Sequence, residues 1–224
     1  MPKISDSKGR SDENSGYARL FGNQQLGQLM SRVQATVIRT GNELENFLEK
    51  ETPNWIKTDF ASALYGMLPL PDIQVVFQAK MPPFGEDRGE KADIVVIEHA
   101  KKNAFVVELK DGDTFDTKKS DGELKSMTRF ASWLAEKTGY TTNFYFCSFN
   151  QSNKQAIIAG AKGRFDASHA MTGRELCNIL SIDYDTLRAK RQQEQPENLR
   201  YFINELLRIE EIRKLIKELW EKVK

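Results

Sequence analysis

Two apolar stretches joined by a short polar turn, at residues 91–99 and 104–112, constrain the fold of this chain more than any other feature. Both stretches are rich in β-branched and aromatic residues, a pattern that predicts a β-hairpin. Because both are apolar on nearly every residue, we expect both faces of the hairpin to be covered by other parts of the chain. Three charged residues interrupt this surface, and charges in such surroundings are usually paired or bind a metal. They are Asp93, Glu108 and Lys110.

The predicted hairpin brings these three residues together. A hairpin folded about Lys101 puts residue 93 opposite residue 109, to within one residue. Glu108 and Lys110 share a strand face because side chains alternate along a strand. Two carboxylates and one ammonium would therefore meet at one end of a sheet. Oxygen ligands suit Mg²⁺, which needs one or two carboxylates together with water and phosphate. The ammonium would then orient or activate water and stabilise negative charge in a transition state.

Asp93, followed on the next strand by Glu108-Leu109-Lys110, resembles the PD-(D/E)xK nuclease superfamily, and within it the type II restriction endonucleases. Ala92 stands at the position of the motif's proline. The resemblance implies that Asp93, Glu108 and Lys110 are catalytic. It also implies that Mg²⁺ is the cofactor, held by the two carboxylates and the backbone carbonyl of Leu109. The alternative is a surface hairpin in which Lys110 forms a salt bridge with one of the acids.

The resemblance covers about residues 40–150 and implies an α/β fold with a restriction-endonuclease-like core, in which helices flank a central mixed β-sheet. The pattern along the chain agrees with this order: three strands, an amphipathic helix at 123–137, and a strand at 142–149 expected to run parallel to its neighbour. Helical N- and C-terminal elaborations complete the chain. We expect a flexible arm at residues 1–20 and a single nuclease domain at 21–224, whose region 151–224 serves specificity or dimerisation.

Apolar spacing predicts the helices outside this core. One is expected from Asn23 to Ile38 and a second from about Glu43 to Glu51, separated at Gly41-Asn42. A long helical region from Glu197 to Val223 carries an apolar stripe, which is interpreted as a packing face or, alternatively, as a dimer face. Glu45 has two interpretations: in the family it resembles an additional active-site acid, whereas its local sequence also fits a solvated helix face.

Several polar residues in the loops and helices around the hairpin are candidates for contacts with DNA. Lysine and arginine neutralise phosphates, whereas glutamine and asparagine hydrogen-bond to base edges. For most of them an ordinary role in a solvated turn or a helix cap is the alternative. The candidates are Lys118, Lys119, Lys125, Arg129, Gln151, Asn153, Lys154, Lys162 and Arg164.

Composition limits the class of protein. The 224 residues are 39% hydrophobic and 29% charged, which favours a globular chain with one sizeable core. No apolar run approaches the length of a membrane span, so no membrane partner is expected. Cys147 and Cys177 lie in apolar contexts and are predicted to be reduced core residues in a prokaryotic cytoplasm. The net charge of +1 does not by itself indicate a nucleic-acid-binding protein, although local basic clusters can still hold DNA.

The resemblance therefore implies a Mg²⁺-dependent type II restriction endonuclease that hydrolyses phosphodiester bonds at a specific site in double-stranded DNA. Because one active site cuts one strand, a homodimer is the simplest assembly. A repair or junction-resolving nuclease of the same superfamily is the first alternative. A non-catalytic DNA-binding module with a fortuitous Glu-x-Lys sequence is the second.

Overall fold

A computed structural model describes residues 1–10, 15–66, 70–81, 89–112 and 117–223, without the side chains of residues 117–120. Contacts divide the chain into two compact units. Unit 1 comprises Met1–Glu43 and Asp185–Lys224, and unit 2 comprises Leu44–Tyr184. The boundary expected at residue 21 does not coincide with this division, since residues 1–10 belong to unit 1. The assignment of an arm and a single nuclease domain stays a prediction.

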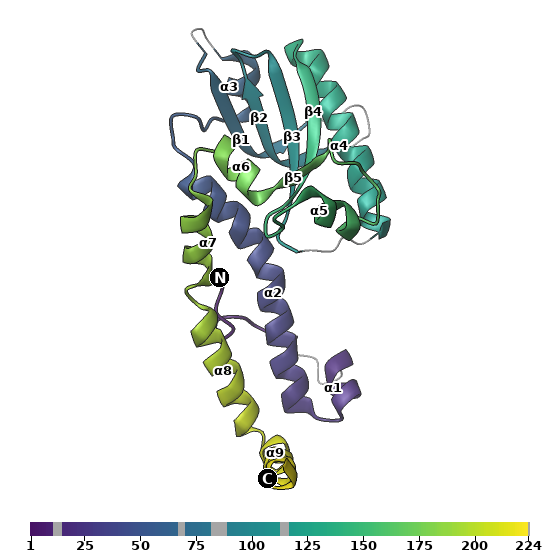
Figure 1. Cartoon of the computed structure of the whole chain (residues 1–224), viewed down its shortest axis with the longest axis vertical. Helices are drawn as coiled ribbons and strands as arrows, with labels where there is room; N and C mark the ends of the chain where they lie inside the picture. The colour runs from purple at the N-terminus through teal and green to yellow at the C-terminus, as the bar shows by residue number, and fades with distance from the viewer. Residues whose placement is uncertain (11–14, 67–69, 82–88, 113–116, 224) are drawn as a thin grey trace. The chain divides into compact units, whose positions relative to one another are not determined.

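Unit 2 is built on a five-stranded mixed sheet, as expected for the fold class (Figure 1). Its strands are β1 (Ile73–Lys80), β2 (Lys91–Glu98), β3 (Asn103–Lys110), β4 (Thr141–Ser148) and β5 (Ala170–Thr172). They lie in sequence order across the sheet. The pairs β1–β2 and β2–β3 are antiparallel, whereas β3–β4 and β4–β5 are parallel. The predicted hairpin and the predicted parallel strand are thus confirmed, while the three-residue β5 was not foreseen.

The hairpin register agrees with the prediction to within one residue. Ile94 pairs with Val107, so position 93 continues opposite position 108. The strands are apolar on both faces because both faces are covered: four consecutive residues of β2, Ile94 to Ile97, have no exposed side-chain surface. A run of this kind is typical of strands inside a sheet that is covered on both sides.

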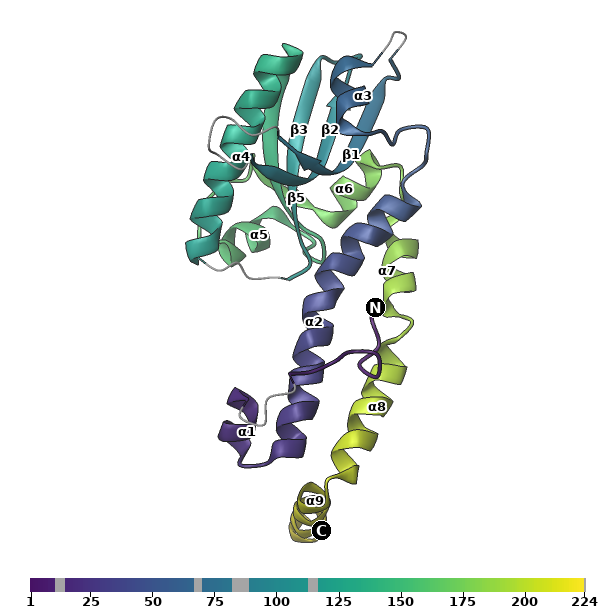
Figure 2. The same cartoon turned by 180° about the vertical axis from the view of Figure 1, so that it is seen from behind.

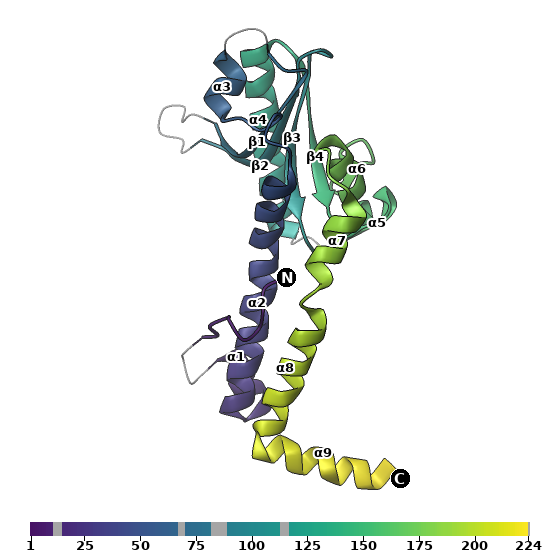
Figure 3. The ribbon, with the colours of Figure 1, turned by 90° about the vertical axis from the view of Figure 1, so that its left-hand side faces the viewer.

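Two helices, α3 (Phe60–Tyr65) and α4 (Thr117–Thr138), cover one face of the sheet (Figure 2, Figure 3). The amphipathic face predicted for residues 123–137 packs here, since Met127, Phe130 and Leu134 are almost fully buried in one cluster with side chains of β2 and β3. On the other face, α6 (Gly173–Ile179) contacts β4 and β5. This arrangement leaves the end of β3 and the first turns of α4 beside each other.

The remaining helix of unit 2 is the short α5 (Lys154–Gly160). Cys147 and Cys177 are free and buried, as predicted. Within the described ranges, no helix combines the length and the apolar character that a membrane crossing needs.

The helices of unit 1 are α1 (Gly16–Phe21), α8 (Gln195–Arg208), α9 (Glu210–Val223), most of α2 (Gln24–Glu51) and all of α7 (Tyr184–Gln192) except its first residue. In this unit α2 and α8 run side by side, joined by a hydrogen bond from Arg32 to the Tyr201 hydroxyl of 2.8 Å (Figure 1). The N-terminal segment contacts α8 through the Ile4 N–H, which donates to Asn198 Oδ1 at 2.8 Å.

Two predicted helix boundaries were wrong. The expected break at Gly41-Asn42 is absent, and α2 is continuous from Gln24 to Glu51. A glycine inside a helix costs only about 1 kcal/mol, which the packing of neighbouring residues such as the fully buried Leu44 outweighs. Conversely, the expected single helix from Glu197 to Val223 is interrupted at Ile209, which adopts an extended conformation with its side chain buried. At this point α9 turns away from α8 (Figure 3).

Candidate active site

Asp93 lies near the start of β2, and Glu108 and Lys110 lie at the end of the neighbouring β3. The paired residues of these two strands end at Ile94 and Val107. Beyond that point the Leu109 N–H donates to Asp93 Oδ2 at 2.7 Å, so the carboxylate takes up a donor that a continued ladder would have paired. The hairpin therefore fixes the position of Asp93 directly against the Glu-Leu-Lys segment.

The Lys110 ammonium lies between two carboxylates. Its Nζ donates to Glu108 Oε1 at 2.5 Å and to Glu123 Oε1 at 2.8 Å. Glu123 comes from α4 and was not singled out from the sequence, where it is one acid in a polar segment. Its side chain is 24% exposed and that of Glu108 only 16%, so both ion pairs are largely shielded from water. The structure thus brings the three predicted residues together and adds a fourth.

Glu45, the additional acid, approaches the same group from α2. Its Oε2 accepts a hydrogen bond from the Gln78 side-chain amide. Burial raises the pKa of the Glu45 carboxyl, and repulsion by Glu108 raises it further, whereas Lys110 acts in the opposite direction. The solvated interpretation of Glu45 is therefore incomplete, because this carboxylate is part of the electrostatic environment of Glu108.

The pKa values of the two central acids show how crowded the site is. Burial raises the pKa of Asp93 to about 6, although the hydrogen bond from Leu109 opposes the shift. Burial likewise raises the pKa of Glu108 to about 7, with repulsion by Asp93 as the next cause. Burial alone would lower the pKa of Lys110, but the carboxylates of Glu108 and Glu123 overcome this effect and raise it. The acids thus repel one another, and the Lys110 ammonium partly compensates their charge.

This donor set fits a hard divalent cation. Asp93 and Glu108 supply carboxylate oxygens at one end of the sheet, and their mutual repulsion is what a bound dication would relieve. Among the described residues, no group of three or more Asp, Glu, His or Cys side chains is arranged so that it could hold a metal ion. Two carboxylates are sufficient for Mg²⁺, which keeps several water molecules and binds substrate phosphate.

The structure gives partners within the chain to several predicted DNA-binding residues. Arg129 pairs with Glu90, Lys154 with Glu175, and Arg164 with Asp121. Asn153 caps α5, since its Oδ1 accepts the Ala156 N–H at 2.8 Å. This is the structural role given above as the alternative.

The other candidates differ in their exposure. Lys125 and Lys162 are exposed, and Gln151 is half-buried. The backbone of Lys118 and Lys119 lies in α4, but their side chains lie outside the described residues. Contacts of all nine residues with DNA stay predictions.

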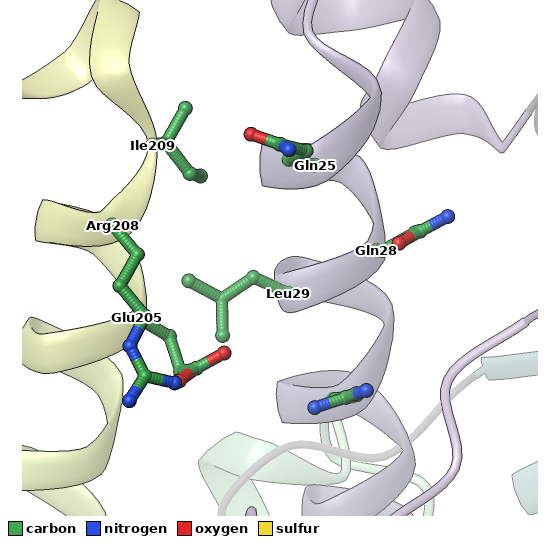
Figure 4. A pocket seen from close by; sticks show the side chains of 7 residues that line it. Gln25, Gln28, Leu29, Glu205, Arg208 and Ile209 are labelled. Carbon is green, nitrogen blue, oxygen red and sulfur yellow. The ribbon is translucent and has the colours of Figure 1, made fainter.

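A pocket of about 190 Å³ lies within unit 1, between α2 and α8 (Figure 4). Gln25, Gln28 and Leu29 line it from α2, and Glu205 and Arg208, which pair with each other, line it from α8. It is smaller than the usual site for a small molecule. None of the candidate active-site residues Asp93, Glu108 and Lys110 lines this pocket.

Comparison with known proteins provides one strong relative. The chain is 39% identical over 231 residues to the type II restriction enzyme HhaII of Haemophilus parahaemolyticus, and the match covers 97% of this chain and 99% of the relative. No model of a protein family matches the chain. Among solved structures, the SUMO protease Ulp1 with its catalytic cysteine oxidised to a sulfenic acid aligns over 66% of this chain and 76% of its own. The TM-score of 0.20 and the identity of 16% are too low to carry any argument.

Proposed function

The chain belongs to the type II restriction enzymes, and on this premise we propose which of its residues cut DNA. As a member of this family it is a site-specific deoxyribonuclease. We assign Asp93, Glu108 and Lys110 as its PD-(D/E)xK motif. The observation that carries the assignment is the meeting of all three at one end of the sheet, where Leu109 donates to Asp93 and Lys110 donates to Glu108.

Asp93 and Glu108 would hold Mg²⁺, with the Leu109 carbonyl as the third ligand. When bound, the ion supplies positive charge and activates a water molecule for attack on phosphorus. Hydrolysis forms a bond from the water oxygen to phosphorus and breaks the bond from phosphorus to the leaving sugar oxygen. Because the carboxyl groups are buried and crowded, they stay ionised most readily when a cation is close to them.

Lys110 would act on the attacking water or on the charge that develops at phosphorus. Its ammonium can donate three hydrogen bonds, two of which the carboxylates of Glu108 and Glu123 accept in this structure. Glu123 would keep the ammonium in place when Glu108 is engaged elsewhere. Two roles remain for Lys110, stabilisation of negative charge and proton abstraction from water, and its replacement by arginine separates them.

The substrate would be double-stranded DNA, cut by a homodimer. Two copies related by a twofold axis can place one active site on each strand. The apolar stripe predicted for Glu197–Val223 supports this assembly in part. On α9 the side chains of Trp220 and Val223 are 66% and 86% exposed. Exposed apolar side chains gathered on one helix are typical of an interaction surface.

The two cysteines support a reducing compartment. Cys147 and Cys177 are buried, and burial raises the pKa of both thiols, so neither is prepared for reaction. We place the enzyme in the prokaryotic cytoplasm on this basis.

Incubation of the purified chain with plasmid DNA tests the proposed function. We expect discrete fragments with Mg²⁺ and none with EDTA. Cuts confined to branched DNA would instead indicate a junction-resolving nuclease. Binding without any cut, over a range of divalent ions, would indicate a non-catalytic module and contradict the proposal.

A further inference from the structure

Gln78 has an uncommon backbone conformation and lies in β1 opposite the candidate metal ligand Asp93. Its φ is +50°, in the left-handed region that residues other than glycine rarely adopt, although it lies inside β1. Its neighbours Phe77 and Ala79 pair with Ile94 and Ala92 of β2, so the register of the two strands is the same before and after Gln78. The position opposite Gln78 is Asp93, and this one pair is absent from the described pairing of the two strands.

The alternation of side chains reverses at Gln78 on β1 and at the opposite position on β2. In a regular strand, residues three apart point to opposite faces. Yet Val76 and Ala79 are buried in the same hydrophobic cluster, and so are Ala92 and Val95. The reversal therefore occurs at residue 78 on β1 and at residue 93 on β2. It turns Asp93 out of the regular pairing, which leaves its carboxylate able to accept the Leu109 N–H.

The side chain of Gln78 has a partner in the same group of acids. Its amide nitrogen donates to Glu45 Oε2, and Glu45 in turn interacts electrostatically with Glu108, Lys110 and Asp93. A carboxylate on α2 is thus held toward the end of the sheet by the residue opposite Asp93. Gln78 thus lies opposite one acid, Asp93, on the neighbouring strand and hydrogen-bonds to another, Glu45.

We propose that Gln78 is a positioning residue of the active site, which holds Glu45 beside the cation-binding carboxylates so that Glu45 orients water around the bound ion. The proposal rests on the proposed function, since it assumes that Asp93 and Glu108 bind a divalent cation. Groups that hydrogen-bond to the ligands of a metal, or to its waters, are commonly needed for full metal affinity.

Glycine is the residue that the backbone at position 78 favours. It adopts positive φ without a steric penalty, whereas glutamine does not. Backbone strain of this kind concentrates at functional sites. There the strained residue is kept because its side chain has a role that a less strained residue could not fill. Gln78→Gly should therefore separate the two contributions, because it keeps the backbone turn and removes only the hydrogen bond to Glu45.

The experiment measures Ca²⁺ and Mg²⁺ binding by calorimetry, and thermal stability in EDTA, for the full chain. For Gln78→Gly we expect a melting temperature equal to or higher than that of the parent, with ion affinity lowered about tenfold. Glu45→Gln should lower the affinity similarly, without any change at residue 78. The double variant should lose little more than either single one, since both disrupt one unit.

Lys102→Gly is the matched control. Lys102 also has a left-handed backbone, with φ +51°, but it lies in the turn between β2 and β3, at the opposite end of the hairpin from Asp93. It should gain stability as Gln78→Gly does and bind the ion as the parent does.

Two results would overturn the inference: parental ion affinity in Gln78→Gly, or a loss of affinity that follows a loss of stability. Failure of the proposed function has a different signature. In that case the parent itself would bind no ion, or Asp93→Ala would bind it as the parent does.

Discussion

Replacement of Glu108 by glutamine should stabilise the metal-free protein while destroying its catalytic site. The carboxylate is 16% exposed and is buried beside Asp93, and its pKa is raised from 4.5 to about 7. In the folded state the ionised form is therefore disfavoured, whereas in the unfolded chain the group ionises near its usual pKa. Glutamine has the same shape as the protonated acid and carries no charge, so it removes this penalty.

The size of the effect follows from the pKa difference. Raising the pKa from 4.5 to about 7 corresponds to roughly 3 kcal/mol, at about 1.4 kcal/mol for each tenfold change in the ionisation constant. Because Asp93 and Glu108 share their mutual repulsion, we expect about 1–3 kcal/mol for Glu108→Gln alone. The folded pKa of this acid is raised, so the penalty is absent below pH 4, develops between about pH 4.5 and 7, and is complete at pH 8.

Urea unfolding in EDTA, at pH 5 and pH 8, measures the difference in free energy of unfolding between the parent and Glu108→Gln. Trp133 of α4, which is buried in the hydrophobic cluster between α4 and the sheet, provides a fluorescence signal for unit 2. The variant should be more stable at pH 8, and its advantage should shrink at pH 5. Saturating Ca²⁺ should stabilise the parent but not the variant. A variant that is no more stable than the parent at pH 8 would refute the reasoning.

Three other predictions concern catalysis, assembly and packing. Lys110→Ala should lose at least about 100-fold in single-turnover cleavage, and in EDTA at pH 8 it should also be less stable, because it leaves the Glu108 and Glu123 carboxylates without their cation. Partial activity in Lys110→Arg would assign charge stabilisation, no activity would assign proton abstraction, and a parental rate in Lys110→Ala would exclude both roles. Light scattering should show a dimer, free or on DNA, and Trp220→Glu should weaken it; a monomer in both states would contradict the proposed assembly. Gly173→Ala should destabilise by about 1–3 kcal/mol in urea unfolding, because its Cβ would lie 2.2 Å from the Phe149 carbonyl oxygen, whereas Gly41→Ala, with open space around it, should be neutral or stabilising.

The hairpin could be predicted from sequence because its signals are local. Two apolar runs and a four-residue turn determine the register to within one residue, and the register alone places Asp93 beside Glu108. The helix order and the parallel β4 followed from the same kind of pattern. The predicted helix boundaries were wrong where tertiary packing outweighed a local sequence signal. This happened at Gly41, which lies inside α2, and at Ile209, which lies between α8 and α9.

The rest of the candidate site depends on three-dimensional packing. Glu123 reaches Lys110 only because α4 lies across the end of β3, and nothing in its neighbouring residues marks it. Gln78 is still harder to recognise, since glutamine gives no sign of a left-handed backbone, which glycine at the same position would have given. Glu45 was identified by resemblance alone, and its proximity to Glu108 depends on how α2 meets the sheet.

The assignment of Asp93 as an essential cation ligand is tested most directly by one pair of measurements on Asp93→Ala. Single-turnover cleavage of plasmid DNA in Mg²⁺ is compared with DNA binding in Ca²⁺, which should support binding with little cleavage. We predict that the folded variant has no detectable cleavage and still binds DNA. Cleavage near the parental rate by the folded variant would contradict the central claim that Asp93, Glu108 and Lys110 form the nuclease centre.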